Sequence, residues 1–167
     1  MDLLRIHKNP LKHPPQMTLE LILQHANRVM EELGTGHREG IYARALVVSL
    51  NNANIGCRTE VDIPIMYEGQ CVGHGRADMI VKNVIVEVKA VCRPPKECMG
   101  QIRKYVENLC RVERKPFHGI VLNFCQQSGT VSLFIHDGKK RLNPSQMLEY
   151  KPSPIVRSRF FPVKRSR

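Results

Sequence analysis

The residues best suited to chemistry are Asp78 and the run Glu87, Val88 and Lys89. Side chains two apart on a strand point to the same face, so Glu87 and Lys89 should emerge side by side from an otherwise apolar strand. Buried acids and amines are rare unless they are paired or bind a metal. A tight turn at Lys82–Asn83 would place Asp78 on the strand that faces Glu87. Two carboxylates and an ammonium would then converge.

Such a group suits the hydrolysis of a phosphodiester bond. Oxygen ligands from Asp78, Glu87 and the Val88 carbonyl fit Mg²⁺ or Mn²⁺, with waters completing the octahedron. The metal would lower the pKa of a water and offset charge on the phosphate, while Lys89 would orient or deprotonate that water. An exposed Glu-Lys pair without a catalytic role is the alternative, because an Asp followed by a distant Glu-x-Lys is a weak signal by itself.

Two helices and a hairpin are expected before these strands. Apolar residues at helical spacing from Leu19 predict a first helix that ends at Gly34, where a left-handed cap fits. A second helix should begin near His37 and end by Asn51–Asn52, forming a helical hairpin with the first. Alternating apolar residues then predict a β-hairpin that turns at Glu68–Gly69, with its second strand over 70–74.

The remaining elements complete an α/β fold. Strands are expected over 76–81 and 84–90 as antiparallel neighbours, then a helix over 96–111 and strands over 117–124 and 131–135. This order predicts a mixed sheet flanked by helices.

The start of the second expected helix carries Glu39 and Tyr42, three residues apart on one helical face. The segment from Gly36 to Tyr42 resembles the signature of the GxxExxY protein family, a branch of the PD-(D/E)XK nuclease superfamily. Further marks of that family follow in order: Tyr67-Glu68-Gly69, Arg76-Ala77-Asp78, Glu87-Val88-Lys89, Gln101 with Tyr105, and Gly119 to Phe124. Ala77 replaces the proline that names the superfamily, and Cys125 stands where glycine is expected. Neither departure removes a catalytic group.

The resemblance implies a restriction-endonuclease-like fold and cleavage of DNA, or less often RNA. It assigns Asp78 and Glu87 as metal ligands and Lys89 as the catalytic lysine. Glu39 would complete the metal shell directly or through water. Gln101 would contact the scissile region or position Lys89.

Positive charge gathers at the two ends of the chain, whose net charge is +11. Residues 139–167 hold nine Lys or Arg and one acid, a balance of +8, and residues 1–16 hold three bases and one acid, a balance of +2. The rest has fourteen bases and thirteen acids. We therefore expect a domain over 17–137 between tails over 1–16 and 138–167. Such basic arms bind nucleic acid or another polyanion, and a solvated tail is the alternative.

Several protein classes are disfavoured. The apolar runs are too short to span a bilayer, and the N-terminus lacks a secretory signal, so we expect no membrane contact and an intracellular protein, cytoplasmic or nuclear. The six cysteines lack zinc spacing and are expected to be reduced thiols. An iron-sulfur cluster on Cys92, Cys98 and Cys110 is the alternative, since some nucleases carry one, but the spacing does not match the ferredoxin or Rieske ligand patterns.

Three functions remain open at this stage. The chain could be an active nuclease, a nucleic-acid-binding protein without catalysis, or a structural part of a larger assembly such as a virion, since the family occurs in bacteria and large DNA viruses. The acid-acid-lysine set favours the nuclease, because a structural role does not need it. Assembly with other proteins through the tails, and pairing into a homodimer, also remain open.

Overall fold

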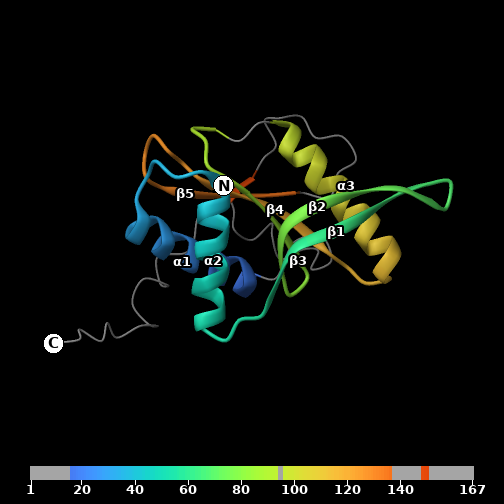
Figure 1. Cartoon of the computed structure of the whole chain (residues 1–167), viewed down its shortest axis with the longest axis horizontal. Helices are drawn as coiled ribbons and strands as arrows, with labels where there is room; N and C mark the ends of the chain where they lie inside the picture. Colours follow the sequence, from blue (N-terminus) through green and yellow to red (C-terminus); the bar gives the residue numbers. More distant parts are fainter. Residues whose placement is uncertain (1–15, 94–95, 137–147, 151–167) are drawn as a thin grey trace.

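A six-stranded sheet in the order β1-β2-β3-β4-β5-β6 organises the protein. The computed structural model describes residues 16–93, 96–136 and 148–150 (Figure 1). Along the chain the elements are α1 (Gln16–Leu33), α2 (Glu39–Asn52), β1 (Cys57–Tyr67), β2 (Gln70–Val81), β3 (Val84–Lys89), α3 (Lys96–Glu113), β4 (His118–Phe124), β5 (Val131–Ile135) and β6 (Leu148–Tyr150).

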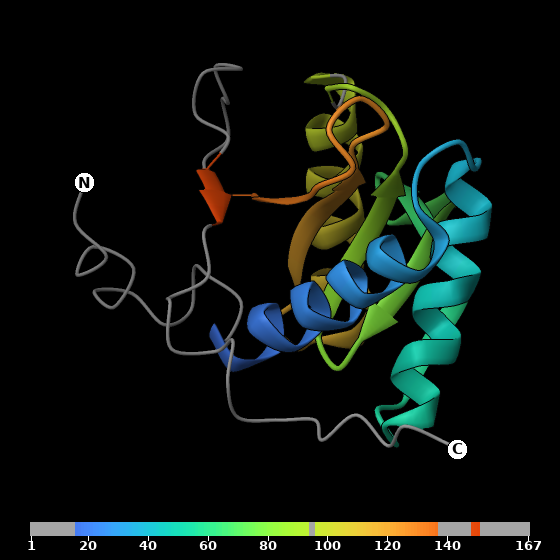
Figure 2. The ribbon, with the colours of Figure 1, turned by 90° about the vertical axis from the view of Figure 1, so that its left-hand side faces the viewer.

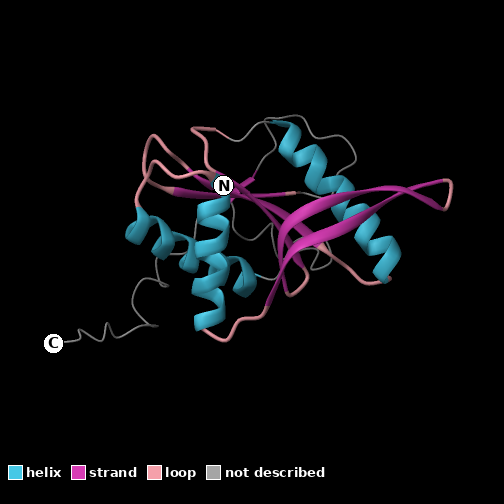
Figure 3. Ribbon diagram, in the orientation of Figure 1, coloured by secondary structure: helices cyan, strands magenta, loops and turns pink. Residues whose placement is uncertain are grey.

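The sheet is mixed. Strands β3 and β4 are parallel and are joined through α3, whereas every other neighbouring pair is antiparallel. A parallel pair needs a crossover connection of this kind, because a short turn cannot return the chain to the same end of the sheet. Figure 3 shows helices on both sides of the strands. The predicted α/β fold with a mixed sheet flanked by helices is confirmed.

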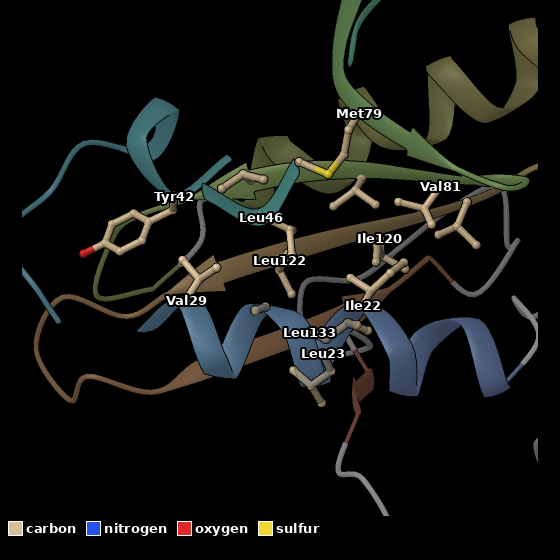
Figure 4. Close-up of a cluster of buried hydrophobic side chains, with 14 of the residues drawn as sticks. Ile22, Leu23, Val29, Tyr42, Leu46, Met79, Val81, Ile120, Leu122 and Leu133 are labelled. Carbon is tan, nitrogen blue, oxygen red and sulfur yellow. The ribbon is translucent and has the colours of Figure 1, made fainter. Parts of the chain in front are cut away.

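Each face of the sheet has its own apolar core. Helices α1 and α2 cover one face and α3 covers the other (Figures 1 and 2). The core beneath α1 and α2 includes the buried side chains drawn in Figure 4, among them Ile22, Leu46, Met79, Ile120 and Leu122. The core beneath α3 is built around Ile102, Ile85 and Val121. Because alternate residues of β3 enter opposite cores, this strand is buried on both faces.

Helix α1 ends as its sequence predicted. Gly34 adopts a left-handed backbone with φ of +69°, and its N–H donates to the Met30 carbonyl at 2.9 Å. Glycine adopts this conformation without a steric penalty. Helix α2 begins at Glu39, two residues after the predicted start.

The β1–β2 hairpin turns at Glu68 and Gly69, as predicted. Both residues have positive φ, +47° and +80°, which is the geometry of a two-residue turn that matches strand twist. The hairpin extends well beyond the rest of the sheet (Figure 1).

The prediction of separate strands over 70–74 and 76–81 is wrong, because β2 runs through Gly75 without a break. Gly75 pairs with Ile63 of β1. A Cβ at this position would overlap the Tyr105 ring of α3, so the glycine marks a close approach to a helix and not the end of a strand.

The sheet includes a strand that the sequence did not predict. Residues Leu148–Tyr150 pair with β5 as β6, inside the segment expected to be a tail. Three residues are too few for a periodic pattern to show. The rest of the expected tails, residues 1–15, 137–147 and 151–167, lies outside the described residues, so the domain limits stay a prediction. Among the helices that the structure describes, none has the length and apolar character needed to cross a membrane.

Candidate active site

Strand β2 separates from β3 at Asp78. Counted from the turn at Lys82–Asn83, the last paired residues of the two strands are Met79 and Val86. Asp78 is therefore the first residue of β2 that lies outside the ladder. The Val88 N–H donates instead to Oδ2 of Asp78 at 2.7 Å. The Asp78 side chain therefore takes the place of a backbone partner and fixes its own position against β3.

Glu87 and Lys89 lie on the face of β3 opposite Val86 and Val88, as the alternation predicted. Val86 and Val88 belong to the core beneath α1 and α2. On the other face, the Lys89 ammonium donates to Oε1 of Glu87 at 2.8 Å. The Glu87 side chain is only 6% exposed, and its Oε2 is buried without a hydrogen-bond partner in the part of the chain that is described. An unpaired buried carboxylate oxygen is costly, so a cation or a hydrogen-bond donor beside Oε2 would stabilise Glu87.

Glu39 joins this group from α2. Its Oε2 lies 3.7 Å from the Lys89 Nζ, so Lys89 links Glu39 to Glu87 although the two acids are far apart in sequence. The Glu39 side chain is 54% exposed. Across the described ranges, no three His, Cys, Asp or Glu side chains are arranged to hold one ion together. The Lys89 ammonium is therefore the centre of the group: Glu39 and Glu87 form ion pairs with it, and Asp78 interacts with its charge. The three carboxylates do not form a metal-binding site with three side-chain ligands.

The electrostatics of the cluster follow from burial and from mutual charge. Burial raises the pKa of Asp78, and the Val88 hydrogen bond and the Lys89 charge only partly oppose it. Burial also raises the pKa of Glu87, helped by the Asp78 charge and opposed by Lys89. For Lys89, burial lowers the pKa, but the hydrogen bond to Glu87 and the charges of Glu87 and Glu39 outweigh it, so the pKa is raised. The acids are therefore desolvated and short of positive charge, while Lys89 stays protonated.

This donor set fits a hard divalent cation. The unpaired Oε2 of Glu87 and the desolvated Asp78 carboxylate are oxygen donors of the kind that Mg²⁺ and Mn²⁺ prefer. A cation beside them would offset the charge that burial leaves poorly compensated.

Gln101 lies on α3 and is directed toward Tyr105. Its Nε2 donates to the Tyr105 hydroxyl at 2.8 Å, and that hydroxyl accepts the Arg76 N–H at 3.2 Å. Gln101 is thus tied to β2 two residues before Asp78. The predicted contact of Gln101 with the scissile region or with Lys89 stays a prediction.

Two residues beside the cluster were given no role in it from the sequence. The Asn123 side chain is buried and bonds both the N–H and the carbonyl of Val91, at 3.2 and 3.0 Å, so it continues the β3–β4 pairing past Lys89. A lone amide in the apolar strand β4 was the available signal. Cys98 of α3 is buried near Lys89; burial raises the pKa of its thiol, and the Lys89 charge only partly opposes this rise. No sequence pattern indicated that proximity.

Tyr42 and His37 lie beside the start of α2. Tyr42 is fully buried and stacks on Phe124 with 4.5 Å between ring centroids, so it packs in the core and is not available to a base. His37 is exposed, with its Nε2 3.3 Å from the Leu33 carbonyl and its ring edge-on to Tyr42. All six cysteines are free thiols.

Comparison with protein families gives one result. The family model described as the PD-(D/E)XK nuclease superfamily matches residues 16–132, a range that contains α1 to β4 and every residue of the cluster. No curated protein and no solved structure matches the chain.

Proposed function

The chain belongs to the PD-(D/E)XK nuclease superfamily, and we propose that it hydrolyses phosphodiester bonds of DNA with a bound divalent metal ion, Mg²⁺ or Mn²⁺. The observation that carries the proposal is the state of Glu87. One of its oxygens accepts from Lys89, and the other is buried and unpaired beside the desolvated Asp78. The mixed sheet flanked by helices is the restriction-endonuclease-like arrangement expected of this superfamily.

We assign the metal to Asp78 and Glu87, with the Val88 carbonyl as a third ligand and waters completing the shell. The ion would lower the pKa of a bound water and offset charge on the phosphate. Glu39 is half exposed and linked through Lys89, so we assign it to the metal shell through water. This placement of Glu39, together with the buried Tyr42, also supports membership of the GxxExxY branch.

Lys89 is held between two acids, with its ammonium hydrogen-bonded to Glu87 and 3.7 Å from Glu39. The raised pKa of Lys89 favours the ammonium form, which can donate hydrogen bonds to a water or a phosphate oxygen. We propose that Lys89 orients the attacking water and stabilises negative charge on the phosphate. Gln101 supports β2 through Tyr105.

A protein that only binds nucleic acid, or a structural component of an assembly, would gain nothing from this cluster. Two desolvated acids with an unpaired buried oxygen destabilise a fold unless a ligand compensates them. The cluster therefore favours catalysis over both alternatives.

The test is a cleavage assay on single-stranded, duplex and branched DNA and on RNA, with Mg²⁺, Mn²⁺ or EDTA. We expect metal-dependent cleavage of DNA that is lost in EDTA and in the Asp78→Asn and Lys89→Met variants, while the affinity for uncleaved DNA stays close to that of the wild type. Equal inactivity of the wild type and Asp78→Asn on every substrate would overturn the proposal.

A further inference from the structure

Gln126 connects two segments that are remote in sequence. It lies in the loop between β4 and β5 and bonds the segment that precedes α2, residues 34–38. Its Oε1 accepts the Gly36 N–H at 2.7 Å, and its Nε2 donates to the Tyr42 hydroxyl at 3.2 Å and to the Phe124 carbonyl at 2.9 Å. Three hydrogen bonds thus use both ends of one carboxamide.

The Tyr42 hydroxyl carries this connection further. It donates to the Gly34 carbonyl at 2.7 Å while it accepts from Gln126. The ring is fully buried against Phe124, and in Figure 4 the hydroxyl points away from the other labelled side chains. The ring is therefore anchored in the core, and its hydroxyl holds the segment before α2.

Other bonds also hold this segment: the Gly34 N–H donates to the Met30 carbonyl, the His37 N–H donates to the Tyr42 hydroxyl at 3.5 Å, and His37 Nε2 lies 3.3 Å from the Leu33 carbonyl. Gly34 and Gly36 both have positive φ, +69° and +98°, and glycine leaves the backbone many alternatives. Arg38 occupies the N-cap of α2 and makes no side-chain capping bond, although Ser, Thr, Asp or Asn usually supplies one there. Gln126 and Tyr42 instead bond the backbone that leads into the helix, at Gly36 and Gly34.

The first residue after this segment is Glu39. We propose that Gln126 is a positioning residue for Glu39: by holding Gly36 and Tyr42 it sets the start of α2, and thereby the 3.7 Å approach of Glu39 to Lys89. This inference rests on the proposed function of the cluster. A displaced Glu39 would weaken the water-mediated metal contact assigned to it and leave the nucleic-acid surface intact.

The variant Gln126→Ala removes all three hydrogen bonds, and Gln127→Ala is the matched control, because Gln127 is the next residue, has the same side chain and is exposed. Amide hydrogen exchange of residues 34–39, measured without metal or nucleic acid, should accelerate in Gln126→Ala and stay at the wild-type rate in Gln127→Ala. Unchanged exchange in Gln126→Ala would remove the physical basis of the proposal.

Kinetics then separate positioning from a purely structural role. Gln126→Ala should lower kcat about 10- to 100-fold with the KM for DNA unchanged, and should raise the Mn²⁺ concentration needed for half-maximal rate. Because Gln126 acts through Glu39, adding Gln126→Ala to Glu39→Gln should slow the enzyme no further. Additive losses would show that Gln126 does not act through Glu39, and wild-type kcat with accelerated exchange would show that Gln126 supports only the fold; either result would overturn the inference.

Calorimetric titration of Mn²⁺ keeps the two proposals apart. If the wild type cleaves no nucleic acid, the proposed function fails, but Gln126→Ala should still bind Mn²⁺ more weakly than Gln127→Ala. The double variant of Gln126→Ala with Glu39→Gln should bind Mn²⁺ as well as Glu39→Gln alone. If Gln126→Ala does not fold, Tyr42→Phe keeps the stacked ring, removes the hydroxyl and should give the same exchange and titration results. Wild-type Mn²⁺ affinity in the variant that folds would overturn the inference.

Discussion

Asp78 and Val88 belong to different strands, and the Asp78 carboxylate accepts the Val88 N–H at 2.7 Å where the ladder between those strands has already ended. One carboxylate thus has a structural hydrogen bond and an assigned metal contact. Removing it entirely would mix the two effects, and the choice of substitution decides which one is measured.

The Asp78→Asn and Asp78→Ala variants separate these roles. Asp78→Ala should lower the free energy of unfolding by about 1–3 kcal/mol, because the buried Val88 N–H loses its acceptor. Asp78→Asn should stay near wild-type stability, because its carboxamide oxygen can accept the same bond and a desolvated charge is removed. Both should lose Mn²⁺ binding. Urea unfolding and calorimetry measure the two properties, and wild-type Mn²⁺ affinity in Asp78→Asn would refute the metal assignment.

Metal affinity should depend on pH through the same acids. Burial raises the pKa values of Asp78 and Glu87 above their ordinary 3.8 and 4.5, so protons compete with the metal at higher pH than for exposed carboxyls. In the metal-free protein, ionised Asp78 and Glu87 lower the free energy of unfolding at pH values above their raised pKa values. This penalty shrinks as the pH falls from the raised values toward the ordinary ones.

The rise in Tm on adding Mn²⁺ should therefore be largest near about pH 7.5 and should shrink as pH falls toward the raised carboxyl pKa values. Differential scanning fluorimetry across this range measures the effect, with Glu87→Gln, which lacks one assigned ligand, as the control that should show no Mn²⁺-induced rise in Tm at any pH. A Mn²⁺-induced rise in Tm that is independent of pH down to about 4.5 would contradict the desolvated site.

Gly75 and Gly73 offer a matched pair on β2. A Cβ at Gly75 overlaps the Tyr105 ring, whereas a Cβ at Gly73 meets nothing within 4 Å. Gly75→Ala should lower the free energy of unfolding by about 1–3 kcal/mol, as overpacking does, and should disturb the bond from Gln101 to Tyr105. Gly73→Ala should be neutral or slightly stabilising, because alanine restricts the unfolded chain. Equal stability of the two variants would contradict this packing.

The local part of the site could be predicted from the sequence. Alternation in β3 placed Glu87 and Lys89 on one face, and the turn at Lys82–Asn83 placed Asp78 on the neighbouring strand, because strand period and turn length are local properties. The helical spacing and the capping glycine likewise predicted α1. These inferences need only residues that are close along the chain.

Contacts between remote segments could not be predicted in this way. Gln126 meets Gly36 across ninety positions, and nothing in a loop glutamine indicates its partner. Gly75 was wrongly taken as the end of a strand. A glycine that leaves room for a side chain of a neighbouring helix, here Tyr105, has the same local sequence pattern as a glycine that ends a strand. The salt bridges that Lys89 makes to both Glu39 and Glu87 depend on how α2 packs on the sheet.

His25 should make stability depend on pH independently of the site. It is buried in α1, and its Nδ1 lies 2.8 Å from the Ser49 hydroxyl of α2. Burial, with a smaller effect of the Arg28 charge, lowers the pKa of His25 below 6.5. The unfolded chain therefore takes up the proton first, so the contribution of neutral His25 is complete above about pH 6.5 and is lost as pH falls below it.

Thermal unfolding between about pH 8 and about pH 5.5 checks this expectation. The Tm of the wild type should fall over this range more steeply than that of His25→Gln, whose carboxamide can still bond Ser49 but does not titrate. Parallel curves for the wild type and His25→Gln would show that His25 is not the titrating group.

The basic end of the chain should dominate long-range attraction to DNA. Residues 17–138 have a balance of only +1, whereas residues 139–167 carry +8. Neutralising Arg157, Arg159, Lys164, Arg165 and Arg167 to Gln leaves β6 in place and removes five positive charges. If each contacts one phosphate, the slope of log affinity against log salt on duplex DNA should become less steep by about 4 to 5.

Binding is best measured in the Asp78→Asn background, where the DNA stays intact, and the loss of affinity should be the same for unrelated sequences because phosphate contacts carry no sequence information. A structural role for this segment predicts a different result: the salt slope would stay the same, and the variant would instead fail to join a larger assembly. An unchanged slope with unchanged affinity would therefore exclude an electrostatic DNA arm, whereas a flattened slope at wild-type stability would establish one, since charge removal alone would then account for the weaker binding.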